Sequence, residues 1–391
     1  MSRASDIALG ILLSLLVLAG NVAQVSARLG FLHKPKQVRE YDHYRYIEMA
    51  RGPEGRPEVA GQPPYCWRIL IPGLARGLQS IGVAENLSFF LITNAALFGF
   101  LLTLWLYLAD IGFSLALRVT ALLLLGFTQG AVRWFEYQYW MTDPAAAFLL
   151  MLAVHWIRRG RTVTFHVLSV VAAFVRETYV VVYPFYLLNL LKRGGSVRDA
   201  VLRTVGVAVV PFAILIALRV LIVPSQPDDF VAAVTDSIAF RFRNLTNNQP
   251  YVLTVGTFGV MFPLLLMFPG RVIALLRKHF DQAGLLACVY ATLVISNNTE
   301  RPLVYALPVV VPAALHQLRA LAEEARLPLL PLCALTVALQ GFLWTETRFA
   351  EIGMSIYQPT NLAVVAAMAL FWLAGQAARR LAGRPVPSRA A

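Results

Sequence analysis

Charged residues are scarce in this chain. They make up 14% of its 391 residues, whereas hydrophobic residues make up 58%, and the mean hydropathy is +0.64. A soluble domain of ordinary make-up carries about 25% charged residues, so the composition excludes that class of protein. It is typical of a polytopic membrane protein.

Cysteine and nucleotide-binding motifs are also lacking. The three cysteines, Cys66, Cys288 and Cys333, form no CxxC or Cys/His spacing, so neither a zinc site nor a disulfide framework is supported. There is no P-loop and no GxGxxG motif, which argues against a donor taken directly from a cytoplasmic nucleotide sugar. The net charge of +13 is carried by residues between apolar runs, where they set topology or meet phosphates, so we expect no nucleic-acid binding.

Apolar runs of roughly 20 residues predict an all-α, polytopic transmembrane helical bundle with about twelve spans. The run at 163–191 is too long for one span and is broken at Arg176 and Glu177, so we divide it into two spans. The other runs lie at 7–25, 86–108, 113–130, 144–157, 205–223, 251–269, 283–296, 303–318, 329–344 and 362–378. We expect one transmembrane domain, 1–391, with a first span at 1–27, an outer loop at 28–85, the remaining spans at 86–378 and a basic tail at 379–391.

Basic clusters give the bundle its orientation. The first apolar run follows Arg3 and has no small-residue cleavage site after it, so we read it as a retained helix. Clusters such as Arg158-Arg159 and Lys192-Arg193 then fall on the cytoplasmic side, together with both termini. The outer loop is the exception, because it is rich in arginine although it lies on the extracytoplasmic side. A functional need for cations would explain that exception.

The outer loop carries two stretches of helical spacing joined by a connector rich in glycine and proline. The first stretch contains Tyr41, Tyr44 and Ile47, and the second contains Trp67 and Leu74. Residues 52–64 form the connector. We expect amphipathic interfacial helices that hold Asp42 at the depth of lipid headgroups. The alternative is an interfacial aromatic belt, with Asp42 paired to a neighbouring arginine.

Short motifs in the chain resemble those of the GT-C superfamily of integral-membrane glycosyltransferases. One span leads to a long outer loop with YDHYRY and PYCWRILIP, and WFEYQYWMTDPAAAFLL, FVRETYVVVYP and TERPLVYALPVVVP follow. The resemblance implies a GT-C-like bundle in which Asp42 stands at the first-loop catalytic acid and Asp143 at the second-loop acid. Several superfamily members have paired acids such as DD, DE or DxD. Here Tyr41 and His43 flank Asp42, and Glu40 is the nearest second acid, which leaves metal dependence open.

The chemistry of sugar transfer from a polyprenyl phosphate suits these residue types. A carboxylate can accept the proton of the acceptor hydroxyl, and Asp42 is the candidate base. The departing lipid phosphate gains charge, which the planar fork of arginine can bind. The candidates for that role are Arg68, Arg176 and Arg301, and the last two adjoin Glu177 and Glu300. The alternative for each arginine is a local ion pair or snorkelling to the interface.

Further candidates extend the predicted site. Glu40 and Asp143 join Asp42 as catalytic candidates. Substrate contacts are also expected from His43, Tyr46, Arg133, Glu177 and Glu300. Asp143 precedes Pro144, so a plain helix N-cap is the alternative for it. If Asp42 and Asp143 converge, they could share a divalent cation, Mg²⁺ or Mn²⁺, or one of them could orient the acceptor.

The sequence therefore predicts a multi-pass enzyme of a plasma (inner) membrane, with an extracytoplasmic active site. It would transfer sugar from a polyprenyl-phosphate donor to a hydroxyl of a glycan, lipid or protein. The alternative is a transporter or flippase of lipid-linked saccharides or small solutes. Inverted repeats and mid-span charges would favour that alternative.

Overall fold

The computed structural model describes residues 2–38, 42–226, 257–295 and 301–344, with isolated residues between 232 and 254 and between 370 and 380. Within these ranges every regular element is a helix, which confirms the all-α prediction. The main helices outside residues 28–85 are α1 (Arg3–Leu29), α5 (Glu85–Asp110), α6 (Leu115–Phe127), α8 (Asp143–Arg158), α9 (Thr162–Ala173), α10 (Val182–Lys192), α11 (Val197–Leu221), α14 (Met261–Met267), α15 (Pro269–Lys278), α16 (Phe280–Ile295), α17 (Leu307–Ala325) and α18 (Leu329–Trp344).

Several of these helices have the length and the apolar composition of membrane-spanning helices. Among the described residues, four are long and apolar enough: α1, α5, α11 and the continuous stretch Arg301–Ala325. A fifth is added if α6 and the following segment to Tyr137, which bend by 46°, count as one span. Exposed apolar side chains cover α1 and α11, as expected for surfaces that face lipid. The chain is therefore a multi-pass membrane protein, while the number of about twelve spans stays a prediction.

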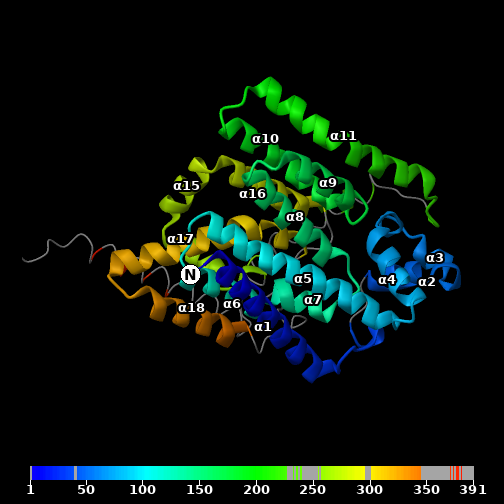
Figure 1. Cartoon of the computed structure of the whole chain (residues 1–391), viewed down its shortest axis with the longest axis horizontal. Coiled ribbons are helices and arrows are strands. Elements are labelled where there is room, and N and C mark those ends of the chain that lie inside the picture. Colours follow the sequence, from blue (N-terminus) through cyan, green and yellow to red (C-terminus); the bar gives the residue numbers. More distant parts are fainter. Residues whose placement is uncertain are drawn as a thin grey trace, which may run out of the picture.

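The predicted break within 163–191 is confirmed. Helix α9 ends at Ala173, Arg176 is extended, and a 3-10 turn, η5 (Glu177–Val181), leads into α10. The turn places Arg176 and Glu177 where two helices meet. Figure 1 shows α9 and α10 beside α11, which forms an outer edge of the bundle.

Three short helices of residues 28–85, which we call the outer loop after its predicted side, gather beside one end of α5 (Figure 1). They are α2 (His43–Arg51), α3 (Pro57–Ala60) and α4 (Leu70–Ser80), with 3-10 turns η2 (Gly52–Glu54) and η3 (Tyr65–Trp67) between them. The predicted pair of helices with a connector is thus confirmed. Buried Glu48 fastens the connector to α2, because its carboxylate accepts the Arg56 backbone N–H at 2.9 Å and pairs with Arg51 at 3.0 Å. This anchoring joins the connector to the last turn of α2, and Asp42 lies at the other end of the same helix.

A tight backbone approach in the connector gives a test of this packing. A Cβ on Gly55 would lie 2.1 Å from the carbonyl oxygen of Glu48. We expect Gly55→Ala to destabilise the protein by about 2 kcal/mol or more, because backbone must move to relieve the overlap. Gly73→Ala is the matched control, since Gly73 lies inside α4 with open space around it, and alanine there should stabilise by about 0.5–1 kcal/mol. Unfolding in detergent measures both, and equal effects would contradict this packing.

Candidate functional site

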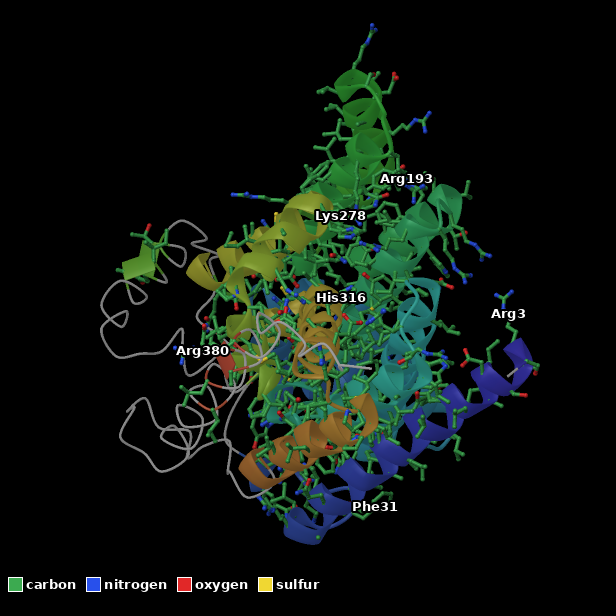
Figure 2. The ribbon with its side chains drawn as sticks, turned by 90° about the vertical axis from the view of Figure 1, so that its left-hand side faces the viewer. Arg3, Phe31, Arg193, Lys278, His316 and Arg380 are labelled. Atoms are coloured by element: carbon green, nitrogen blue, oxygen red, sulfur yellow. The ribbon has the colours of Figure 1, made fainter. Side chains whose placement is uncertain are left out.

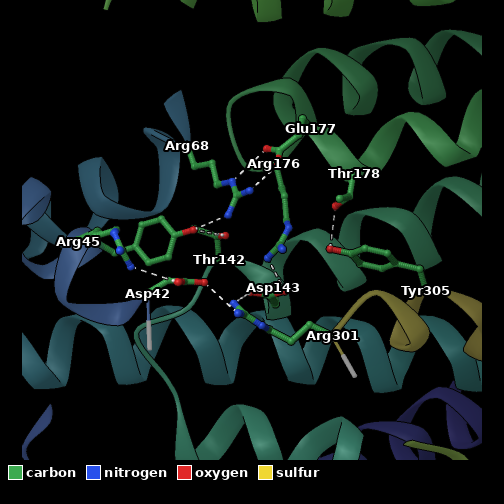
Figure 3. A network of polar contacts seen from close by, with 11 residues as sticks. Asp42, Arg45, Arg68, Thr142, Asp143, Arg176, Glu177, Thr178, Arg301 and Tyr305 are labelled. Atoms are coloured by element: carbon green, nitrogen blue, oxygen red, sulfur yellow. Dashed lines mark hydrogen bonds and ion pairs between the residues drawn. The ribbon is translucent and has the colours of Figure 1, made fainter. Parts of the chain in front are cut away.

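Charged side chains from five separate segments meet in one buried cluster (Figure 3). The outer loop supplies one side of the cluster, the first residue of α8 and the break before α10 supply another, and the start of η7 (Arg301–Ala306) closes it. We call this cluster the charge network. It consists of Asp42, Arg45, Tyr46, Arg68, Asp143, Arg176, Glu177 and Arg301.

Asp42 lies just before α2 and is held from two sides. Its carboxylate lies 2.9 Å from Arg301 Nη2 and 3.2 Å from Arg45 Nη1. Burial alone would raise the pKa of Asp42, but Arg301, the hydrogen bond from Tyr65 and the charge of Arg68 outweigh it and lower that pKa below its usual value. Asp42 is therefore a carboxylate at neutral pH, in the ionisation state that a general base requires.

Arg301 bridges the two candidate acids (Figure 3). Besides its bond to Asp42, its Nη1 lies 3.6 Å from Asp143 Oδ2. The other oxygen of Asp143 forms an ion pair with Arg176. Neither Asp143 oxygen accepts a hydrogen bond from a described residue, and Thr142 occupies the N-cap position of α8. The N-cap alternative for Asp143 is therefore wrong, because its carboxylate faces arginines.

Arg68 joins the outer loop to the break before α10. Its Nε donates to Glu177 at 3.0 Å, and a second guanidinium nitrogen pairs with the other oxygen of that carboxylate. Its Nη1 donates to the Tyr46 hydroxyl at 2.8 Å. All three nitrogens of this arginine are therefore engaged, which locks the loop against the helical bundle.

The charge network carries more positive than negative charge. Four arginines stand against three carboxylates, those of Asp42, Asp143 and Glu177. Three of the arginines, all except Arg45, are buried. The three carboxylates match the three buried arginines in number, so the excess positive charge is that of the partly exposed Arg45. A cluster with net positive charge attracts an anion. The described residues of this cluster are thus suited to a phosphate.

A divalent cation fits this arrangement poorly. Among the described residues no group of three or more His, Cys, Asp or Glu side chains has the geometry to hold a metal. Asp42 and Asp143 do converge, but the guanidinium of Arg301 stands between them. The positive charge that a shared Mg²⁺ or Mn²⁺ would supply is supplied by arginine.

The other predicted site residues have different outcomes. Arg133 lies half-buried at the end of η4 (Gln129–Arg133). His43 is fully buried, with its ring 4.3 Å from that of Tyr44 and 5.4 Å from that of Trp140, which favours a packing role. Glu40 and Glu300 lie outside the described residues. The catalytic and binding roles of the whole set stay predictions.

Two members of the site were missed in the sequence. Arg45 follows Asp42 by one helical turn, and the (i, i+3) spacing could have indicated the pair. The Tyr65 ring packs against two guanidinium groups. Its centre lies 4.4 Å from the guanidinium carbon of Arg45 and 5.2 Å from that of Arg68. No local pattern in the sequence distinguishes a cation–π partner from a tyrosine of an interfacial belt.

His43 gives the fold a defined acid sensitivity. Burial lowers its pKa to about 4, against the opposing charge of Asp42. The unfolded chain gains a proton on this residue below pH 6.5, whereas the folded chain gains it only near pH 4. The neutral His43 ring therefore contributes fully to the free energy of unfolding above pH 6.5. As the pH falls from 6.5 to 4, the protein loses about 3 kcal/mol of that free energy.

Replacing His43 by phenylalanine should remove this part of the acid sensitivity. The ring between Tyr44 and Trp140 is kept, but it has no proton to gain. We expect the wild-type protein to lose about 3 kcal/mol more than His43→Phe between pH 7 and pH 4, measured by unfolding in detergent. Equal losses would mean that His43 is protonated at its usual pH in the folded protein.

Taken together, these features define an all-α, multi-pass membrane protein whose outer loop closes a buried charge network. No family model and no curated protein matches the sequence. Among solved structures, the chain resembles the crystal structure of ArnT from Cupriavidus metallidurans bound to undecaprenyl phosphate. The TM-score is 0.50 at 12% identity, over 97% of this chain and 77% of that one. The chain thus has a GT-C-like fold, as the sequence motifs predicted.

Proposed function

We propose that this protein is a GT-C type glycosyltransferase that moves a sugar from a polyprenyl-phosphate donor to a hydroxyl acceptor. The observation that carries this proposal is the charge network, in which Arg301 joins two carboxylates and arginines outnumber acids. The fold supports it, because the similar ArnT structure was solved with undecaprenyl phosphate bound. The acceptor hydroxyl belongs to a glycan, a lipid or a protein.

Asp42 is the proposed general base. As the acceptor oxygen attacks the anomeric carbon, its proton passes to the Asp42 carboxylate. The bond between the anomeric carbon and the donor phosphate oxygen breaks, and its electrons leave with the polyprenyl phosphate. Asp42 is 8% exposed and Asp143 only 1%, so Asp42 is the acid that an acceptor can reach. Asp143 is proposed to position Arg301 and Arg176.

The arginines are proposed to bind the phosphate as it gains charge. Guanidinium groups fixed before the reaction stabilise developing negative charge without reorganising. Arg176 and Arg301 are held by carboxylates on one side, which orients their forks. Arg68 is already fully engaged by Glu177 and Tyr46, so it is proposed to hold the loop in place as well as to add positive charge.

The proposed active site faces the extracytoplasmic side of the plasma membrane. Asp143 is the first residue of α8. Arg158 is the last residue of that helix, and Arg159 follows it. The positive-inside rule assigns that basic end to the cytoplasm, and the charge network then lies at the outer end. The orientation is a proposal that labelling of a cysteine at the exposed Glu54 of the connector, in Glu54→Cys, can test in intact cells.

Sugar transfer itself can be assayed with purified protein in detergent. A polyprenyl-phosphate donor with a labelled sugar should lose its label to acceptor, with release of polyprenyl phosphate in equal amount. A nucleotide sugar should give no transfer. If proteoliposomes move the intact donor between leaflets without cleaving it, the protein is a flippase and the transferase proposal is wrong.

A further inference from the structure

A second charged cavity lies at the opposite end of the bundle from the charge network. It measures about 490 Å³ and opens where the last residues of α5, α8 and α10 come together. Its lining includes four cations, Arg158, Arg159, Lys192 and Arg193, and one carboxylate, that of Asp110. The volume is within the range of small-ligand sites.

The two ends are clearly separated along α8. This helix begins at Asp143, in the charge network, and ends at Arg158, in the cavity. At 1.5 Å per residue the two positions are about 22 Å apart along the helix axis. Figure 2 shows Arg193 at the other end of the structure from Phe31, which follows α1 at the start of the outer loop. The cavity therefore faces the side that the basic clusters assign to the cytoplasm.

Three of the four cations have partners that account for them. Arg159 forms two bonds to Asp110, at 2.6 and 2.7 Å. Lys192 pairs with the buried Asp281 at 2.9 Å. Arg193 Nη2 donates to the carbonyls of Ile157 and Arg158, at 2.8 and 2.6 Å, and so caps the end of α8.

Arg158 is different. Its nearest carboxylate oxygen, on Asp281, is 4.0 Å away, which is too far for a hydrogen bond. That carboxylate is already bonded by Lys192 and Asn189. Nε and Nη2 of Arg158 are buried and donate to no described residue. The guanidinium carbon of Arg158 lies 5.5 Å from the centre of the Tyr107 ring.

Membrane topology alone does not require this arrangement. The positive-inside rule needs only cations near the cytoplasmic end of a helix, and exposed side chains such as Arg198 on α11 satisfy it. It requires neither a cavity nor a half-buried guanidinium without a hydrogen-bond acceptor. A buried donor left without an acceptor costs free energy that a bound anion recovers.

We propose that this cavity binds a phosphate group, with Arg158 as its principal ligand and Lys192 and Arg193 beside it. Two sources supply this chemistry at a cytoplasmic membrane surface. One is the headgroup of an anionic lipid, and the other is free inorganic phosphate or pyrophosphate. Cation pockets between transmembrane helices are suited to lipid headgroups.

Thermal unfolding of the full chain in a neutral detergent can separate the two sources. The probes are dioctanoyl phosphatidic acid, dioctanoyl phosphatidylcholine as the neutral lipid, and inorganic phosphate. Each probe that binds the folded protein raises the unfolding temperature in a concentration-dependent way. A shift with phosphatidic acid alone indicates a lipid site, and an equal shift with inorganic phosphate indicates a site for free phosphate. Failure of both phosphate probes to bind overturns the proposal.

Variants assign binding to the cavity. Arg158→Gln should weaken the apparent affinity about tenfold or more, while the matched charge change Arg198→Gln, on an exposed residue, should leave it within about twofold. Because Arg176 of the charge network is itself proposed to bind phosphate, the titration is repeated with Arg176→Gln. If that variant loses affinity for the probe while Arg158→Gln keeps the wild-type affinity, the proposal is overturned. If Arg158→Gln does not fold, the affinity of Arg193→Gln, a change at an exposed residue of the cavity, is measured instead. An unchanged affinity in that variant also overturns the proposal.

Discussion

Replacing Asp42 by asparagine is expected to lower the rate of sugar transfer by about two to four orders of magnitude. That is the usual contribution of a positioned general base. Asparagine keeps the shape of the side chain but cannot accept the acceptor proton. The measurement is the rate of polyprenyl phosphate release at saturating donor, with binding of the donor measured separately. Donor affinity should change much less than the rate, because Arg176 and Arg301 remain.

A matched change on the same helix controls for lost stability. Glu48 is also a buried acid of the outer loop with two arginine partners, Arg51 and Arg56, but it anchors the connector and lies outside the charge network. Glu48→Gln should lower the unfolding temperature and leave the transfer rate of the folded protein within a fewfold of wild type. If Asp42→Asn retains full activity while folded, Asp42 is not the base.

Hydropathy was enough to predict the all-α class and the break at Arg176. Both depend on local composition, because an apolar run with a charged pair inside it cannot stay one lipid-facing helix. The two short helices of the outer loop were likewise evident from residue spacing. The need for glycine at position 55 could not be predicted in this way. It arises because the Glu48 carbonyl lies too close for a Cβ atom, and not from the backbone conformation of Gly55 itself.

The partners within the charge network could not be predicted. Seven of its eight members were chosen from the sequence, and the structure brings those seven together. Yet Asp42 and Arg301 are 259 residues apart, and no local signal indicates that one arginine serves both Asp42 and Asp143. His43 was chosen because it adjoins Asp42, but a helix turns adjacent residues in different directions, and its ring packs into the core.

Replacing Arg301 by glutamine is the second change with a large expected effect. Arg301 is the foremost charge that lowers the pKa of Asp42, so without it that pKa rises. Activity requires the carboxylate and is lost as pH falls through its pKa. The acidic limb of the pH–rate profile should therefore move to higher pH, and the rate at neutral pH should fall by about two orders of magnitude or more. An unshifted acidic limb would contradict the role of Arg301 beside Asp42.

Stability distinguishes a bridging arginine from one that merely lies nearby. Arg301→Gln leaves the carboxylates of Asp42 and Asp143 facing each other, and Asp143→Asn leaves Arg301 and Arg176 facing each other, so each single change should destabilise the protein. The double variant removes one charge of each sign, and its loss of stability should be smaller than the sum of the two by about 1 kcal/mol or more. Transfer activity should not recover with it. Additive losses would mean that Arg301 and Asp143 do not interact in the folded protein, and the network would then lack the bridge that holds its two acids together.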